Sequence, residues 1–246
     1  MKKTFFAVIL ALLFFAGPLM SQKQLYFGVA GTGLSSVIIN QNNYGYTALD
    51  EKFTMGAAGN VNIGFDFSNH VGLKLEIGIA KLGENYDKEI TKNDTLFNFT
   101  RDVKLNYLQI PLLFKFRTGG DVAKFYLMAG PQFNFLLSAS QKYLKNEVVE
   151  SGTFPGPGNI PVVLGEETIT DWYNSFDVMG RLDLGVDIQL AKFLSLNVGL
   201  TMAYGFMDIN AKGYDIPDTD GNYNPSHNVY GGINFGINYL LPLGSK

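Results

Sequence analysis

Residues 53–67, FTMGAAGNVNIGFDF, decide the fold. Every odd position in this stretch is apolar or glycine, and every even position is small or polar. Successive side chains of a β-strand point to opposite faces, so such a strand has one apolar face and one face of small or polar side chains. A strand that separates lipid from a narrow polar lumen needs this two-sided pattern.

The same alternation returns along most of the chain. It resumes directly after the turn at 68–70, and it recurs in the segments 25–30, 71–79, 125–139, 176–190, 194–206 and 229–241. Together with 53–67 and 103–117 these make eight strands. Their connections are short at 68–70, 117–121 and 191–193, and long at about 34–51, 81–101, 140–175 and 208–227. The pattern predicts an all-β fold, an eight-stranded antiparallel up-and-down transmembrane β-barrel with periplasmic termini and long outer loops.

One strand departs from the alternation. In 103–117, Val103 and Leu105 share one parity, whereas the apolar residues from Leu108 onward take the other. Pro111 lies inside the same run and cannot donate a hydrogen bond to a neighbouring strand. These two features predict a β-bulge between Tyr107 and Pro111.

The first residues have the order of a secretory signal peptide. Lys2 and Lys3 precede an apolar run over 5–16, and small residues follow at Gly17 and Ser21. The run is shorter than the roughly 20 residues of a membrane-spanning helix, although an uncleaved anchor is the alternative. We expect a signal peptide over 1–21, cleavage near Ser21/Gln22, and an outer-membrane barrel domain over 22–246.

The amino-acid composition argues against several classes of function. The net charge of -3, with no clustered Lys/Arg patch, gives no reason to expect a nucleic-acid partner. Cysteine is absent, which excludes disulfides, thiolate nucleophiles and cysteine-bound metals. No hydrolase or phosphate-loop motif occurs, so we expect no cofactor and no enzyme activity.

A soluble eight-stranded barrel is the alternative fold, and it would place the apolar residues inside. Two observations favour the membrane barrel. The apolar faces of the assigned strands carry no charged residue, and aromatic residues collect at both strand ends. A charge at mid-membrane is costly, and aromatic belts mark the two membrane interfaces.

Two stretches resemble a known family. Residues 106–115, NYLQIPLLFK, resemble the "YLxIPLLxK" strand of PorT-like outer-membrane β-barrel proteins of Bacteroidetes, and 125–135, FYLMAGPQFNF, resemble the "YxxAGP" strand that follows it. Gln22, just after the expected cleavage zone, also fits that group. The resemblance implies an outer-membrane location and an eight-stranded barrel, and it implies little about activity.

Charged residues on the polar strand faces are the first candidate site. They would point into the lumen, and they are Asp66, Lys74, Glu76, Lys115, Lys124, Asp177, Arg181, Asp183 and Asp187. Buried charges need partners, and both signs are present, so an ion-pair network that fills the barrel is the favoured interpretation. A selective pore is the alternative.

The loops hold three further candidates. Trp172 and Tyr173, in the 140–175 loop, could anchor a surface ligand, or Trp172 could mark the outer aromatic belt. Residues 218–224, DTDGNYN, offer oxygen ligands for Ca²⁺ but lack the spacing of a calcium loop, which favours a solvated turn. His227 follows Ser226 at the start of the last strand, but adjacency in sequence is not a catalytic triad.

These features lead to one expectation and two alternatives. The expected function is a structural or surface-interaction role carried by the outer loops. A narrow permeation barrel comes second, and an outer-membrane enzyme third. The expected partners are outer-membrane lipid, the barrel-assembly machinery during insertion, and a surface protein or glycan.

Overall fold

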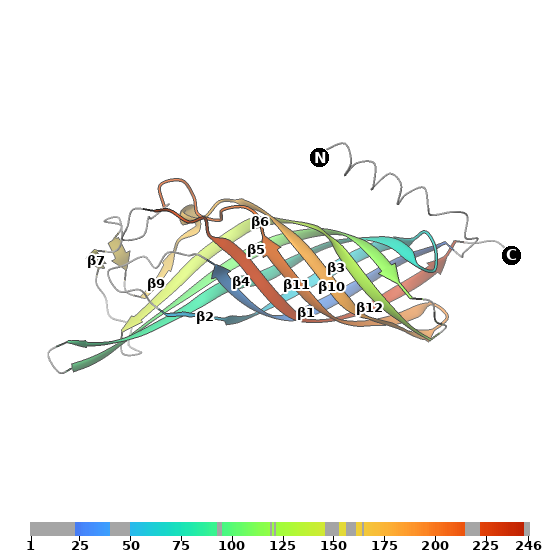
Figure 1. Ribbon diagram of the computed structural model, residues 1–246, viewed down its shortest axis with the longest axis horizontal. Coiled ribbons are helices and arrows are strands. Elements are labelled where there is room, and N and C mark those ends of the chain that lie inside the picture. The colour runs from blue at the N-terminus through green and yellow to red at the C-terminus, as the bar shows by residue number, and fades with distance from the viewer. Residues whose placement is uncertain are drawn as a thin grey trace.

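Eight antiparallel strands close into one hydrogen-bonded ring (Figure 1). The computed structural model describes residues 23–39, 50–92, 95–118, 120, 122–145, 153–155, 161–163, 165–214 and 222–243. The ring strands are β1 (Gln24–Ile39), β3 (Thr54–Asp66), β4 (Val71–Lys92), β5 (Thr95–Arg117), β6 (Ala123–Lys145), β10 (Phe176–Ala191), β11 (Leu194–Gly205) and β12 (His227–Pro242). This confirms the predicted fold. The expected signal peptide and its cleavage site lie outside the described residues.

Two pairings close the ring. β1 pairs with β12 along its whole length, from Gln24 opposite Pro242 to Ile39 opposite His227. β6 pairs with β10, from Ala123 opposite Ile188 to Phe135 opposite Phe176. The remaining neighbours follow each other along the chain, which is the up-and-down topology. Closure leaves no free sheet edge within the wall, as a barrel in lipid requires.

Exposure alternates along each strand as the polarity pattern does. Leu184 is 45% exposed on the outer surface, whereas its neighbour Asp183 and the nearby Arg181 are buried inside. On β3 the odd positions face out and the even positions face in. The apolar side chains therefore lie on the outside of the barrel, whereas a soluble barrel has them inside.

Exposed aromatic residues form a belt at each end of the wall. Near the turns at 67–70, 118–122 and 192–193 the belt contains Phe67, Phe114, Phe116, Phe125, Phe193 and Tyr239. At the opposite end it contains Phe53, Phe135, Tyr204 and Phe206. On the outer surface of β4 and β5 the exposed apolar side chains give way to the exposed Lys81 and Lys104 towards this end. The apolar band thus has two aromatic borders, as in membrane barrels.

Three strands continue beyond the outer belt, where long loops were expected. β4 extends to Lys92 and β5 begins at Thr95, so most of the predicted 81–101 loop is a paired hairpin. β6 extends to Lys145 and pairs there with β9 (Gly165–Thr168), while β2 (Asp50–Lys52) pairs with β4. We call this projecting part the outer sheet; it extends from one end of the barrel in Figure 1.

The predicted bulge between Tyr107 and Pro111 is wrong. β5 alternates without a slip from Val103 to Lys115, and the register on β4 is the same on both sides of Pro111. The irregularity lies on β6, where Asn106 faces Ser138 but Tyr107 faces Leu136, so Leu137 is the extra residue. Val103 and Leu105 point inward because the lumen itself is apolar at that level.

Three further small elements lie outside the ring. β7 (Thr153–Pro155) pairs with β8 (Pro161–Val163), and η2 (Thr170–Trp172) is a single 3-10 turn. Among the described residues, no helix is long and apolar enough to cross a bilayer.

Candidate functional site: the closed interior and the outer sheet

A cluster of buried charges crosses the lumen at mid-height. The Arg181 guanidinium on β10 donates to Glu76 Oε2 on β4 at 2.8 Å, and to both carboxylate oxygens of Asp183 at 2.9 Å each. Lys74 Nζ contacts Glu76 Oε1 at 2.6 Å, and the Thr201 hydroxyl donates to Asp183 at 2.5 Å. β5 and β6 separate β4 from β10 in the ring, so the ion pair between Arg181 and Glu76 spans the interior. Two cations and two anions balance each other within this cluster.

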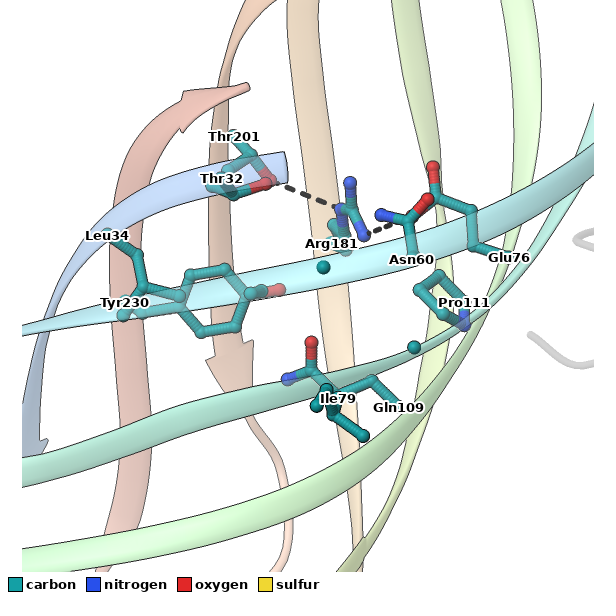
Figure 2. A pocket seen from close by; sticks show the side chains of 13 residues that line it. Thr32, Leu34, Asn60, Glu76, Ile79, Gln109, Pro111, Arg181, Thr201 and Tyr230 are labelled. Carbon is teal, nitrogen blue, oxygen red and sulfur yellow. Dashed lines mark hydrogen bonds and ion pairs between the residues drawn. The ribbon is translucent and has the colours of Figure 1, made fainter. Parts of the chain in front are cut away.

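Little free space remains beside this cluster. A cavity of about 10 Å³ is lined by Arg181, Glu76, Gln109 and Tyr230, among others, and Figure 2 shows these side chains converging. A water molecule needs roughly 10–15 Å³ by this measure, so the cavity holds one at most. The lumen is therefore filled by its own side chains at mid-height.

A second charged group lies at the end of the barrel with the short turns, which the sequence predicts to be periplasmic and which we call the periplasmic end. Lys115 Nζ lies 2.5 Å from Asp187 Oδ2, and Arg117 Nη1 lies 2.9 Å from Asp66 Oδ2. Lys124, also predicted to face inward, lines the mouth of the lumen here.

Above mid-height the interior contains hydrogen bonds between buried polar side chains. Asp177 is buried on β10, and Gln132 donates to Asn134 at 2.9 Å and accepts from the Tyr230 hydroxyl at 2.8 Å. Asn228 donates to the Tyr107 hydroxyl at 3.1 Å. Each of the nine predicted interior charges thus faces the lumen or its mouth, and seven of them belong to ion pairs.

An apolar core fills the outer end of the lumen. We call this set the outer core; it contains Leu34, Ile38, Leu82, Val103, Leu105, Ile169, Tyr173, Met179 and Ile209. Loop backbone holds it in place: Ile169 N donates to Ala139 O at 2.9 Å, and Ile209 N to Ser226 O at 3.0 Å. A hydrated ion that entered this layer would lose its water without gaining polar partners.

A family model described as "Outer membrane protein beta-barrel domain" matches residues 17–211. The chain belongs to this family. The match extends over most of the chain, and it agrees with the closed ring and its apolar exterior. The protein is therefore an outer-membrane β-barrel.

Solved structures of several outer-membrane barrels are similar to this barrel. Neisserial surface protein A has 13% identity and a TM-score of 0.43, with 87% of this chain and 96% of that chain covered. A major outer membrane protein from Thermus thermophilus has 14% identity and a TM-score of 0.45, with 89% and 99% covered. Ail of Yersinia pestis has 10% identity and a TM-score of 0.38, with 90% and 100% covered. A comparison with curated protein sequences finds no match.

The two predicted loop anchors of this outer-membrane barrel pack in or against its outer core. Tyr173 is only 4% exposed and belongs to the outer core, so its ring is not available to a surface ligand. Trp172 packs against the same core and stacks on Tyr214, with ring centroids 5.4 Å apart. Both residues fix the outer loops to the barrel, and Trp172 does not belong to the aromatic belt.

Ser226 and His227 do not form a catalytic pair. Ser226 is buried and its hydroxyl accepts from Asn210 Nδ2 at 2.9 Å. His227 is next along the strand, so it points to the opposite face, where it stacks on Tyr204. Of the 218–224 segment, residues 218–221 lie outside the described residues, and Tyr223 donates to Asp208.

Sequence reasoning missed several polar residues of the interior. Arg117 is two positions after Lys115, so the same alternation would have placed it inside. Glu84, Arg101 and Gln141 were missed because they fall in or beside segments predicted to be loops. In the structure Arg101 donates to Gln141 at 2.8 Å, and Gln141 donates to Glu167 at 2.9 Å.

The buried carboxyl of Glu84 should make the stability of the protein depend on pH. It is buried at the outer end of the lumen, opposite the outer-core residue Val103 on β5, and it accepts from the Tyr86 hydroxyl at 2.5 Å. Burial raises the pKa of Glu84 from 4.5 to about 8. The unfolded chain releases this proton near pH 4.5, whereas the folded chain keeps it to about pH 8, so the free energy of unfolding should fall as the pH rises through this window.

We expect the Glu84→Gln variant to lose this pH dependence. Urea unfolding at pH 5 and pH 8 measures it, and the gap between the two midpoints should shrink in the variant. Glu89→Gln is the matched control, because Glu89 is exposed on the same strand. An unchanged gap in Glu84→Gln would mean that this carboxyl is not buried in the folded protein.

Proposed function

We propose that this outer-membrane barrel is a closed scaffold that presents its outer sheet to a partner at the cell surface. The role is one of binding and not of catalysis. The observation that carries the proposal is the combination of a filled lumen with strands that continue past the membrane. A conducting barrel needs an open path, and neither the charged cluster around Arg181 nor the outer core leaves one.

The outer sheet has the features of a binding surface on a rigid support. β4, β5 and β6 continue directly from the barrel wall, so the outer sheet shares its backbone hydrogen-bond network. Its outward face carries exposed Lys81 and Lys104. Rigid scaffolds that display exposed polar surfaces are common in recognition, because little order must be gained on binding.

We also infer that the chain belongs to the PorT-like group of Bacteroidetes. The support is the strand motif at 106–115 together with the one at 125–135. In the structure these strands pair with each other, Pro111 opposite Gln132 and Phe114 opposite Ala129. This inference adds no activity to the proposal.

The experiment compares the intact mature protein with two variants in nanodiscs. In one, residues 146–164 are replaced by a short Gly-Ser linker, which keeps β6, β9 and η2. The other is Lys81→Glu/Lys104→Glu. The probes are a glycan array and photo-cross-linking to surface proteins of the source cells. Binding by the intact protein should fall at least tenfold in one of the variants, and a Lys192→Gln control on a periplasmic turn should bind normally.

Planar-bilayer recordings complete the experiment. The intact protein should give no steady single-channel steps. Steady steps that change in size with Asp183→Asn would overturn the closed scaffold and favour the permeation barrel. If both variants bind the partner as well as the intact protein does, then neither the outward face of the outer sheet nor the segment 146–164 is the binding surface.

A further inference from the structure

A small polar pocket opens at the periplasmic mouth of the lumen. It has a volume of about 30 Å³. Its lining includes Tyr26, Asp66, Lys115, Arg117, Lys124 and Asp187. A water molecule needs roughly 10–15 Å³ by this measure, so the pocket has room for about two small polar atoms.

Each acid in this pocket lies within salt-bridge distance of one cation, although among the described residues the Asp66 oxygens make no hydrogen bond, and one further cation has no acid at that distance. Asp187 is paired with Lys115 at 2.5 Å, and Asp66 with Arg117 at 2.9 Å. Within the described part of the chain, the Lys124 side chain makes no hydrogen bond and has no carboxylate within 4.0 Å. Three cations and two anions therefore leave one positive charge in excess, and it resides on Lys124.

Tyr26 adds an unused hydrogen-bond donor to the same space. Its side chain is 2% exposed, and its hydroxyl has no hydrogen-bond partner among the described residues. Gly64 makes room for the ring, because a Cβ there would lie 2.0 Å from Tyr26 Cζ. Lys115 Nζ lies over the same ring, 5.0 Å from its centroid. A buried hydroxyl without a partner is unfavourable, so a ligand that accepts a hydrogen bond from it is favoured.

We propose that this pocket binds a carboxylate group that enters from the periplasm. The two carboxylate oxygens match the room available. The Tyr26 hydroxyl donates to one oxygen, and the Lys124 ammonium balances the charge and donates to the other. The proposal is independent of the surface role, because the pocket lies at the opposite end of the barrel from the outer sheet.

The carboxylate can come from a free small acid or from the C-terminus of a periplasmic peptide. The probes are therefore ¹³C-labelled acetate, the peptide Ala-Ala-Ala, and the same peptide with an amidated C-terminus. The mature protein in detergent micelles is titrated with each, and NMR line broadening of the probe reports binding. Acetate and the free peptide should bind, and the amide should not. Binding of acetate alone would identify a free small acid as the source, and a tighter free peptide would identify a chain terminus.

Two variants test the assigned donors. Tyr26→Phe removes only the hydroxyl, and Lys124→Met removes only the charge. Each should weaken acetate binding about tenfold or more, because hydrogen bonds to a charged group contribute roughly 1.5–3 kcal/mol. Lys192→Met is the matched control: it makes the same charge change on an exposed lysine of a periplasmic turn, and acetate should bind it as it binds the intact protein.

Three results would overturn the proposal. The first is no binding of acetate or free peptide to the intact protein, which would mean that the pocket holds only water. The second is equal weakening in Lys192→Met and Lys124→Met, which would indicate general charge attraction. The third is full binding by Tyr26→Phe, which applies even if Lys124→Met does not fold.

Discussion

Replacing Arg181 by Met should lower the free energy of unfolding by about 3–5 kcal/mol. The guanidinium makes four contacts with buried partners: two with Asp183, one with Glu76 and one with Thr201. Met has a similar length but no charge, so the balanced cluster becomes one cation facing two carboxylates. An uncompensated carboxylate in this interior is costly, because little water can enter to solvate it. Urea unfolding from lipid vesicles measures the difference.

The control is the double variant Arg181→Met/Asp183→Asn. It restores the charge balance, because Lys74 and Glu76 remain paired at 2.6 Å. The double variant should recover a large part of the stability that Arg181→Met loses. If it is no more stable than the single variant, then unbalanced charge is not the cause, and the guanidinium acts through packing alone.

The second large effect concerns the lipid-facing wall. Leu184 lies at mid-height on β10, faces outward and pairs with Leu200 on β11. Leu184→Arg should cost about 2–4 kcal/mol, because the charge would lie at the centre of the hydrocarbon layer. The same unfolding assay in lipid vesicles reports this loss.

Leu190→Arg is the matched control on the same strand and the same face. Leu190 is 55% exposed beside the periplasmic turn, where the expected cost is only about 0–1 kcal/mol. The large difference between the two positions is a signature of membrane depth. Equal losses at both positions would argue against a bilayer around this wall.

The two-residue period is why the barrel could be predicted from the sequence. A strand has only two faces, so a one-residue slip would turn every apolar side chain inward. Phe65 and Asp66 therefore had to point opposite ways, and the structure places them so. The same logic placed Arg181 and Asp183 inside.

The sequence pattern failed where the lumen changes its polarity. Val103 and Leu105 face inward, and their parity suggested a slip because the interior was assumed to be polar throughout. The loops at the outer end cover the lumen with apolar side chains such as Ile169 and Ile209, so apolar residues occupy both faces of the wall there. Alternation alone cannot report that change.

The outer sheet was missed for a related reason. Beyond the membrane a strand needs no apolar outer face, so polar residues such as Lys81 and Asn85 were assigned to a loop. The bulge at Leu137 was also hidden, because an extra outward leucine looks like any other lipid-facing residue. Trp172 and Tyr173 were expected at the surface, since nothing in the chain order indicates that η2 packs against the outer core.

A single-cysteine scan of β11 tests the central claim most directly, because the natural chain contains no cysteine. A spin label is placed in turn at each of residues 194–205 in lipid vesicles, and its collisions with membrane-dissolved oxygen and with a water-soluble nickel complex are measured. Oxygen contact should rise at Leu196, Val198, Leu200 and Met202, and fall at the positions between them. The opposite phase, with the nickel complex reaching the leucine positions and oxygen reaching Asn197 and Thr201, would contradict an apolar exterior in lipid around a closed polar interior.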